Sequence, residues 1–444
     1  MSASAPARGQ HETIFALATA PGRAGVAVIR VSGPRADDAL QALTRQKLPA
    51  ERNAALRTVF DLSNDTAIDV ALVLRFVSPR SYTGENVVEV QSHGGPAVVA
   101  SLLGALGALP GLRLAEPGEF TRRAVENGRL DLTQAEAIAD LVAAETESQR
   151  RQALRQFEGR LGQVYEDWRG RLIRAAAWVE AAIDFPDEEI PTDAVQRSRQ
   201  AISDLAAEIR VHLNDGRRGE ILRDGLQVAV IGAPNAGKSS LVNALARRDV
   251  AIVSPLPGTT RDVIEVRLDL KGYPVVLADT AGLRAPEGSI EEEGIRRARA
   301  RAEAADLRLI VRDGSEWGGD EAVLEGSPSD LVVWNKADLA PTRSMPGLWI
   351  SAKTGEGLPE LIEQLAARAE VGMDQGEAPV LTRARHRQAL ELAVESLDKA
   401  KVAKAPELTA EYLRQALREI ARTTGRVDLD ELLDVVFRDF CLGK

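Results

Sequence analysis

The sequence has very little cysteine and few aromatic residues. Cys441 is the single cysteine among 444 residues, so no intramolecular disulfide can form, and we expect a reducing, cytoplasmic compartment. The four histidines are scattered along the chain, which excludes a zinc site of the usual ligand spacing. Trp, Tyr and Phe number only 5, 4 and 8, too few for an extended base-stacking platform.

Long hydrophobic runs are also missing. No stretch approaches the roughly 18 apolar residues of a membrane span, and Met1 to His11 contain no apolar segment of a secretion signal. We therefore expect neither membrane insertion nor export. Acidic residues outnumber basic residues by 66 to 56, giving a net charge of −10, which argues against a generally basic, nucleic-acid-coating surface and leaves a local basic patch open.

The length of 444 residues predicts about three domains, each able to bury its own core. Short strands and turns from Ile14 to about Phe120 predict an α+β domain, with strands at Val26–Val31, Val70–Phe76 and Val87–Val90. Leu226–Ile231 is a continuous apolar strand that opens a doubly wound α/β unit extending to about Ala369.

Two helical blocks flank the α/β unit. Apolar residues recur every three or four positions from Leu154 to Val179 and from Ile202 to Leu213, and again from Leu408 to Phe437 beyond a polar linker at 375–379. Each block has an apolar face without a partner of its own, so we expect the two to form one bundle with the α/β unit inserted. The expected domains are residues 1–120, 121–220, 221–372 and 373–444.

A phosphate-binding loop follows the strand Leu226–Ile231. Gly232-Ala-Pro-Asn-Ala-Gly237-Lys238-Ser239 matches G-x-x-x-x-G-K-[ST], and the helix-forming run Ser240–Ala246 comes directly after it. In this context the glycines let the backbone wrap phosphates, Lys238 reaches the β and γ phosphates, and the Ser239 hydroxyl binds Mg²⁺.

The choice of GTP over ATP rests on two later segments. Asn335-Lys336-Ala337-Asp338 follows the strand Leu331–Trp334, and the carboxylate of Asp338 can accept from both N1–H and the exocyclic amine of guanine. Ser351-Ala352-Lys353 follows another short strand and would close the other side of the base. Either segment alone is typical of an ordinary polar loop; their order and spacing predict guanine recognition.

The remaining GTPase motifs lie between these segments. Asp279-Thr280-Ala281-Gly282 ends the strand Val275–Ala278, which places Asp279 where it can hold Mg²⁺ through water and Gly282 where its amide can sense the γ phosphate. Ser254-Pro-Leu-Pro-Gly-Thr-Thr260-Arg-Asp262 lies where a switch loop is expected, with Thr260 as the second Mg²⁺ hydroxyl. Its Pro and Gly content alone would indicate only a surface loop.

One GTPase residue is missing. Leu283 stands where Ras-like GTPases have a glutamine that orients the attacking water, so another group must do so. Glu291-Glu292-Glu293 is the downstream candidate, although three acids before a helix are also typical of a solvated first turn that complements the helix dipole. No arginine can be singled out as an arginine finger.

With these motifs in place, the chain resembles the MnmE (TrmE) family of tRNA-modification GTPases over essentially its full length. The resemblance rests on more than the GTPase motifs. It includes Thr19–Gly25, Ile29–Gly33, Tyr82-Thr-Gly-Glu85, Glu89–Gly95, Pro117-Gly-Glu-Phe120, Arg129–Asp140 and the terminal Cys441-Leu-Gly-Lys444. The resemblance implies an N-terminal α+β domain that binds folate and forms dimers, followed by a helical domain that contains the P-loop GTPase domain.

The resemblance also implies an activity. The family's members are K⁺-dependent GTPases that act with the flavoprotein MnmG, in a heterotetramer or larger complex. Together they add an aminomethyl or carboxymethylaminomethyl group to C5 of the wobble uridine, position 34, of certain tRNAs. The methylene carbon would come from 5,10-methylenetetrahydrofolate or its 5-formyl analogue, and FAD would belong to the partner. A homodimer in the cytoplasm is implied, with no membrane attachment.

The resemblance assigns roles to particular residues. Glu291 matches the glutamate that orients water, and Arg30, Glu89, Arg129 and Lys444 match the folate contacts, although each alone could be plain surface charge. K⁺ would be bound by Asn235 and by carbonyls of Ser254, Leu256 and Thr259. The implied GTP-binding set is Asn235, Ala236, Gly237, Lys238, Ser239, Ser240, Ser254, Pro255, Leu256, Pro257, Gly258, Thr259, Thr260, Asp279, Thr280, Ala281, Gly282, Asn335, Lys336, Ala337, Asp338, Ser351, Ala352 and Lys353.

Some alternatives stay open at this point. Cys441 could take part in uridine chemistry as a thiolate, or it could serve structure near the terminus. Trp334 and the proline-rich Ser254–Pro257 differ from the residues that are most common at these positions in the family. A regulatory GTPase without modification activity would usually have a second GTPase domain or a basic RNA-binding module, and neither is present here. A folate-binding module with a vestigial GTPase is disfavoured because every nucleotide motif is intact.

Overall fold

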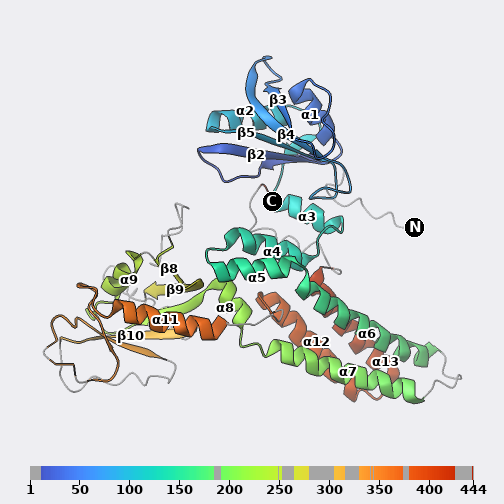
Figure 1. Ribbon diagram of the computed structural model, residues 1–444. Helices are drawn as coiled ribbons and strands as arrows, with labels where there is room; N and C mark the ends of the chain where they lie inside the picture. The colour runs from blue at the N-terminus through green and yellow to red at the C-terminus, as the bar shows by residue number, and fades with distance from the viewer. Residues whose placement is uncertain are drawn as a thin grey trace, which may run out of the picture. The chain divides into compact units, whose positions relative to one another are not determined.

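The computed structural model describes residues 12–184, 192–248, 250–252, 265–279, 305–315, 330–340, 342–343, 345–373, 380–425 and 443. The chain divides into two compact units, residues 1–139 with 421–444 and residues 140–420, whose elements are labelled in Figure 1. None of the helices in these described ranges is long and apolar enough to cross a membrane.

The N-terminal unit contains a six-stranded sheet in the order β3-β4-β5-β2-β1-β6. Only the β1–β6 pair is parallel, and the other pairs are antiparallel. Helices α1 and α2 pack on the sheet through one apolar core that includes Leu40, Leu43, Leu102 and Leu106. The elements are β1 (Thr13–Leu17), β2 (Ala24–Ser32), α1 (Ala36–Thr44), β3 (Ala55–Phe60), β4 (Ala67–Phe76), β5 (Val87–Gly94), α2 (Pro96–Gly107), β6 (Leu112–Leu114) and α3 (Glu119–Glu126).

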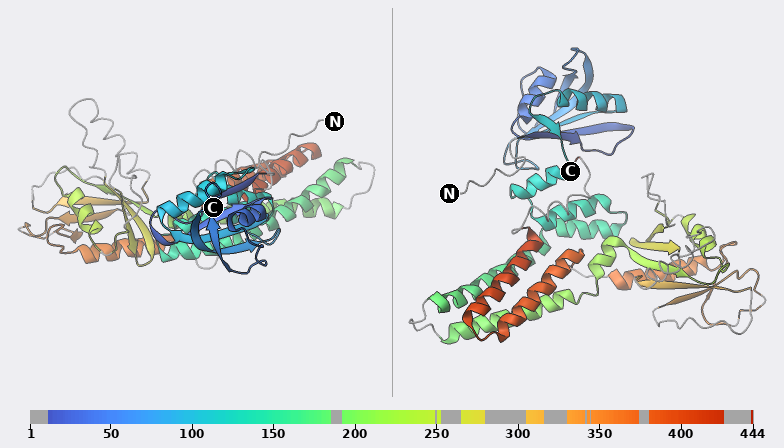
Figure 2. Two further views of the ribbon diagram at one scale, coloured as in Figure 1. Left: turned by 90° about the horizontal axis from the view of Figure 1, so that it is seen from above. Right: turned by 180° about the vertical axis from the view of Figure 1, so that it is seen from behind.

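The helices on either side of the α/β unit share one core. Tyr165 and Trp168 of α6 lie in the same buried cluster as Ile209 of α7, Leu390 of α12 and Leu413 of α13. Figure 2 shows these four helices side by side. The helices are α4 (Leu132–Ala143), α5 (Glu147–Phe157), α6 (Arg160–Asp184), α7 (Thr192–Leu213), α8 (Arg218–Asp224), α12 (Ala384–Val402) and α13 (Pro406–Thr424).

The prediction of one continuous apolar helix face from Leu154 to Val179 is wrong at its N-terminal end. The chain forms two helices there, because α5 ends at Phe157 and Gly159 adopts a left-handed φ of +83° before α6 begins. Leu154 and Phe157 are therefore 40% and 36% exposed. Of the rest of this face, Leu161, Trp168, Leu172 and Ala175 are buried, and Val164 and Val179 are partly buried. Leu408, expected on the buried face of α13, is also exposed.

The α/β unit has a second six-stranded sheet, in the order β12-β11-β10-β7-β9-β8, with only β8–β9 antiparallel. Because its parallel strands point the same way, the segments that follow β7, β9, β11 and β12 begin at one edge of the sheet. The elements are β7 (Leu226–Ile231), α9 (Lys238–Ala246), β8 (Glu265–Leu270), β9 (Tyr273–Asp279), β10 (Leu307–Asp313), β11 (Leu331–Asn335), β12 (Leu348–Trp349) and α11 (Leu358–Met373).

Candidate functional site

The loop between β7 and α9 depends on backbone geometry that few residues adopt. Asn235 and Gly237 have φ angles of +67° and +91°, in the left-handed region that favours asparagine and glycine. A Cβ added at Gly232 would lie 2.1 Å from the carbonyl oxygen of Val311 in β10, so glycine alone fits there. Helix α9 begins directly after the loop, at Lys238, and its first amides favour an anion.

Lys238 is held at this loop by its own backbone. Its side chain is largely buried, and its ammonium donates hydrogen bonds to the carbonyl oxygens of Gly232 and Ala233, both at 2.8 Å. The cation is thus fixed beside the amides that would hold phosphates. Ser239, the predicted Mg²⁺ ligand, is the second residue of α9.

No group of three or more His, Cys, Asp or Glu side chains in the described segments could hold a metal ion. Hydroxyl and phosphate oxygens are of the kind that Mg²⁺ prefers as ligands.

Asn335 ties the base-recognition segment to the phosphate loop. Its side chain is buried, and its amide nitrogen donates to the carbonyl oxygen of Ala236, at 2.9 Å. The amide oxygen of Asn335 accepts from the backbone N–H of Ala352 at 3.0 Å. A Cβ at Gly237 would lie 2.2 Å from the Asn335 amide nitrogen. Three predicted segments are therefore joined through this one side chain.

Asp338 is oriented by Ser351. The Ser351 hydroxyl donates to Oδ1 of Asp338 at 2.6 Å, and the same hydroxyl accepts from the N–H of Thr354 at 3.1 Å. The backbone N–H of Ala337 donates to the carbonyl oxygen of Ile350 at 2.9 Å, which closes the two loops on each other. Lys353 is exposed in the turn that follows. The predicted guanine acceptor thus has one oxygen fixed by a neighbouring loop.

Lys336 has a partner that the sequence did not indicate. It adopts a left-handed φ of +63°, and its ammonium pairs with Asp313, at the end of β10, at 2.5 Å. Burial raises the pKa of Asp313, but hydrogen bonds from Lys336 and Ser315 outweigh it and hold that pKa below its usual range. The pair fixes the direction of the base-recognition loop.

Trp334, which departs from the common family text, has a local structural role. Its ring stacks on Trp349, its register partner in β12, with ring centres 5.5 Å apart and planes 19° apart. The indole N–H of Trp334 donates to the carbonyl oxygen of Pro346 at 3.1 Å. Two tryptophans thus pack the ends of β11 and β12 just before the loops that are predicted to recognise the base.

Other predicted site residues are only partly placed. Asp279 ends β9, where its backbone pairs in register with Val230 of β7. Ser240 continues α9. Thirteen predicted site residues lie outside the described segments: Ser254, Pro255, Leu256, Pro257, Gly258, Thr259, Thr260, Thr280, Ala281, Gly282, Glu291, Cys441 and Lys444.

In the N-terminal unit, Arg30 and Glu89 are brought together by register. They face each other across β2 and β5, and Nε and Nη2 of Arg30 lie 3.0 and 2.9 Å from Oε1 of Glu89. The guanidinium lies 4.8 Å from the ring centre of Tyr82 and 5.7 Å from that of Phe120. Both rings lie in segments that carry the family resemblance, but the sequence analysis assigned no function to either residue.

The C-terminal segment also meets this unit. Nη1 of Arg30 lies 3.5 Å from the carbonyl oxygen of Gly443, 413 residues away in the sequence. A Cβ at Gly443 would lie 2.3 Å from both the Cα of Ala18 and the carbonyl oxygen of Leu17, so only glycine allows this approach. This close packing explains why the terminal tetrapeptide contains a glycine before its lysine.

Tyr82–Glu85 and Pro117–Phe120, two of the segments that carry the family resemblance, take part in a buried ion network. Arg123 of α3, 5% exposed, pairs with Glu119 at 2.9 Å and with Glu85 at 3.1 Å. The Ser32 hydroxyl donates to Glu85 at 2.7 Å. Glu85 and Glu119 therefore stabilise the unit from within. Arg129 lies beside this network, where its Cγ would be 3.2 Å from a Cβ at Gly84.

Comparison with known proteins agrees with this architecture. The protein family described as "GTP-binding protein TrmE N-terminus" matches residues 13–129, and "MnmE helical domain" matches residues 132–441. The tRNA modification GTPase MnmE of Parvibaculum lavamentivorans is 56% identical over 98% of this chain and 100% of its own. The mitochondrial 5-taurinomethyluridine-[tRNA] synthase subunit GTPB3 of Homo sapiens is 48% identical over 100% and 95%, respectively.

Among solved structures, the G domain of the T. maritima FeoB iron transporter covers 32% of this chain and 98% of its own, with 30% identity and a TM-score of 0.25. The family matches and the curated relatives span nearly the whole chain. The chain therefore belongs to the MnmE family of tRNA modification GTPases.

Proposed function

We propose that this chain is a K⁺-dependent GTPase that, with the flavoprotein MnmG, adds an aminomethyl or carboxymethylaminomethyl group to C5 of the wobble uridine of certain tRNAs. The observation that supports GTP most strongly is the contact between loops at one sheet edge. Asn335 joins the phosphate loop to the Ala352 loop, and Ser351 fixes one oxygen of Asp338. A carboxylate so held can accept two hydrogen bonds from guanine and none of the same kind from adenine.

Binding and positioning of GTP fall to groups that the fold brings together. The amides of the loop and of the first turn of α9 would hold the phosphates, and Lys238 would exchange its two carbonyl partners for phosphate oxygens. Ser239 and Thr260 would supply hydroxyls to Mg²⁺, with Asp279 acting through water. A bound Mg²⁺ would neutralise negative charge on the phosphates.

The catalytic assignments follow from the family. Glu291 would orient the attacking water, since Leu283 cannot. Asn235 and the carbonyls of Ser254, Leu256 and Thr259 would hold K⁺ where other GTPases use an arginine finger. The left-handed backbone of Asn235 supports this assignment, because it turns the loop at the residue whose side chain would meet the cation.

The one-carbon donor would bind the N-terminal unit. Arg30 and Glu89 form a charged pair suited to the amide edge of a pterin, and the nearby Tyr82 ring offers a flat apolar surface. Arg129 and Lys444 would meet the glutamate tail, and Cys441 remains a candidate for uridine chemistry. The tetrahydrofolate supplies the methylene carbon when bound, and FAD would come with MnmG.

The expected assembly is a homodimer that joins MnmG in a heterotetramer or larger complex and acts on tRNA in the cytoplasm. The proposed domains remain residues 1–120, 121–220, 221–372 and 373–444. Separate buried clusters within residues 15–106 and 222–373, and one shared by residues 161–209 and 381–420, support this division.

The decisive experiment is nucleoside mass spectrometry of tRNA from cells that lack this protein. The cells are rescued with the wild-type chain or with Glu291→Ala, which is expected to fold and bind GTP without hydrolysing it. Loss of C5-aminomethyl-type uridines that only the wild type restores is the expected result. Restoration by Glu291→Ala would remove the role assigned to that glutamate. Modified uridines that persist in the deletion, with no other enzyme to supply them, would favour a regulatory GTPase instead.

A further inference from the structure

A cavity of about 80 Å³ lies at one end of the four-helix bundle. It is formed near the end of α6, by the first turns of α7 and by the connection between α12 and α13, four helices that Figure 2 shows side by side. Small residues on three of these helices, Ala182, Ser198 and Ala400, line it and leave the space unfilled. None of the described nucleotide-site residues lines it. The cavity thus results from side chains too small to fill the gap between the helix ends.

Trp178 of α6 borders this cavity with an accessible ring. It follows Ala175, a buried residue of the same helix, by three positions, so it lies at the border of the buried face and is 47% exposed. Trp168 in the same helix is only 1% exposed, and its indole N–H donates to Glu208 at 2.8 Å. The indole N–H of Trp178 has no hydrogen-bond partner among the described residues. Trp178 therefore presents a flat apolar surface that the bundle itself does not cover.

Three exposed cations line the same cavity. They are Arg199 of α7, Lys401 of α12 and Lys404 of the connection to α13, and none has a hydrogen-bond or ion-pair partner within the described ranges. No acidic side chain is among the described residues that line the cavity, and the nearby carboxylate of Glu180 is held by Arg414 at 2.8 Å. This end of the bundle therefore has an excess of positive charge in a chain whose net charge is −10.

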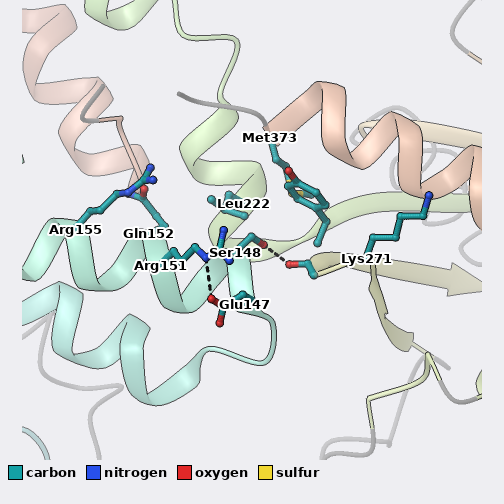
Figure 3. A pocket seen from close by; sticks show the side chains of 10 residues that line it. Glu147, Ser148, Arg151, Gln152, Arg155, Leu222, Lys271 and Met373 are labelled. Carbon is teal, nitrogen blue, oxygen red and sulfur yellow. Dashed lines mark hydrogen bonds and ion pairs between the residues drawn. The ribbon is translucent and has the colours of Figure 1, made fainter. Parts of the chain in front are cut away.

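The cavity between α5 and the β8–β9 turn, of about 240 Å³, differs in the state of its cations (Figure 3). There Arg151 pairs with Glu147 at 2.7 Å, and Lys271 pairs with Glu363 at 2.5 Å. Arg155, which also lines that cavity, interacts with another group as well. Because its cations already have partners, charge favours the end of the bundle as the place where an anion binds.

We propose that this end of the bundle binds a single-stranded segment of tRNA, an inference that rests on the proposed function of the chain on tRNA. One base would stack on Trp178, and the neighbouring phosphates would meet Arg199, Lys401 and Lys404. Every nucleotide combines a flat ring with a negative charge, which is the combination that these four side chains leave unmatched. An acidic segment of a protein would match the cations, but it offers a ring only where an aromatic residue lies beside its acids. The chemistry therefore favours RNA.

The contribution of charge is tested by two substitutions on one helix. Lys401→Gln and Lys399→Gln each remove one positive charge from α12, but Lys399 does not line the cavity and pairs with Glu395 at 2.7 Å. Fluorescence anisotropy measures tRNA binding to the full-length protein at several salt concentrations. We expect Lys401→Gln to weaken binding by about fivefold and to reduce the slope of log affinity against log salt by about 0.7. Lys399→Gln should change the affinity by less than about twofold.

The contribution of stacking is tested at Trp178. Trp178→Leu keeps an apolar side chain and removes the ring, whereas Trp178→Phe keeps a ring. We expect Trp178→Leu to weaken tRNA binding by about tenfold and Trp178→Phe by less than about threefold. A short oligouridylate should quench part of the tryptophan fluorescence of the wild type and less of that of Trp178→Phe. A thermal melt of each variant verifies that it is folded.

Several outcomes would overturn the proposal. They are equal weakening by Lys399→Gln and Lys401→Gln, wild-type affinity in Trp178→Leu, and a wild-type chain that binds no tRNA. Unchanged RNA affinity in the Lys401 and Trp178 variants, with loss of binding to purified MnmG, would assign the surface to a protein partner and reject the RNA contact. Failure of the proposed function would show elsewhere, as modified wobble uridines that persist in cells lacking the chain.

Discussion

The nucleotide site and the Arg30 site are held together by different means. The nucleotide site depends on glycines and backbone turns, and its segments are short, local motifs that one buried amide, Asn335, joins across 99 residues. The site around Arg30 depends on one ion pair and two aromatic rings. Its members come from strands β2 and β5, from the segment between β4 and β5 that contains Tyr82, from Phe120 of α3 and from Gly443. Backbone-built sites leave motifs in the sequence, whereas sites assembled from single side chains leave few.

The largest expected effect tests the backbone dependence of the nucleotide site. Gly237→Ala would force a Cβ into a left-handed backbone at φ +91° and to 2.2 Å from the Asn335 amide. Because strain and lost hydrogen bonds add, we expect GTP affinity to fall by at least about 100-fold in a titration with a fluorescent GTP analogue. Gly104→Ala in α2 is the matched control, since no atom lies within 4 Å of its added Cβ. Normal GTP binding by Gly237→Ala would contradict the dependence on backbone geometry.

A second prediction concerns the base. Asp338→Asn replaces an acceptor of two guanine donors with a group that accepts one and donates one. We expect GTP affinity to fall about 10- to 100-fold and affinity for xanthosine triphosphate to rise, because the new amide can donate to the 2-oxo group. Competition between the two nucleotides measures both changes at once. If the affinities for GTP and xanthosine triphosphate fall equally, the substitution has disrupted the loop, and a direct contact between Asp338 and the base is not supported.

The third prediction addresses the site built from side chains. Arg30→Ala removes the partner of Glu89 and the cation beside Tyr82, so we expect affinity for 5-formyltetrahydrofolate to fall about tenfold by calorimetric titration. GTP binding should stay unchanged, because no described GTP-site residue contacts Arg30. Arg122→Ala is the matched control in the same unit, since it breaks the ion pair with Glu126 on α3. Equal loss in both variants would point to general destabilisation.

The smallest expected effect is a change in the thermal stability of the N-terminal unit with pH. Burial raises the pKa of Glu119, but hydrogen bonds from Arg113, Arg123 and the Glu116 amide outweigh it and keep that pKa below its usual range. A folded-state pKa below the unfolded one stabilises at neutral pH, and this stabilisation is lost as pH falls through the folded-state value. We therefore expect the thermal midpoint of the N-terminal unit to drop on acidification below about pH 4.5.

Scanning calorimetry of the full chain from pH 6 to 3.5 measures this drop, which Glu119→Gln should reduce. All five tryptophans lie between residues 168 and 349, so tryptophan fluorescence follows the other unit separately. If the thermal midpoint of Glu119→Gln falls as steeply with pH as that of the wild type, groups other than Glu119 cause the fall.

Much of the GTPase region was predictable from the sequence, because glycine spacing and strand ends determine where its loops lie. Strand β7 has the predicted limits, and β9 and β11 differ from them by two residues or fewer. The break between α5 and α6 was not predicted, because the apolar spacing continues across a turn whose signal is the single residue Gly159. The Lys336–Asp313 pair was also not predicted, since nothing in the spacing of those residues indicates contact.

By itself, the sequence determined the order of the motifs, the nucleotide chemistry and the family, because these depend on residue types at short fixed spacings. Only the tertiary structure decided which distant side chains meet. Strand register paired Arg30 with Glu89, and close packing placed Gly443 against β1. Such contacts depend on how elements pack across many intervening residues, and the local pattern of a sequence does not contain that information.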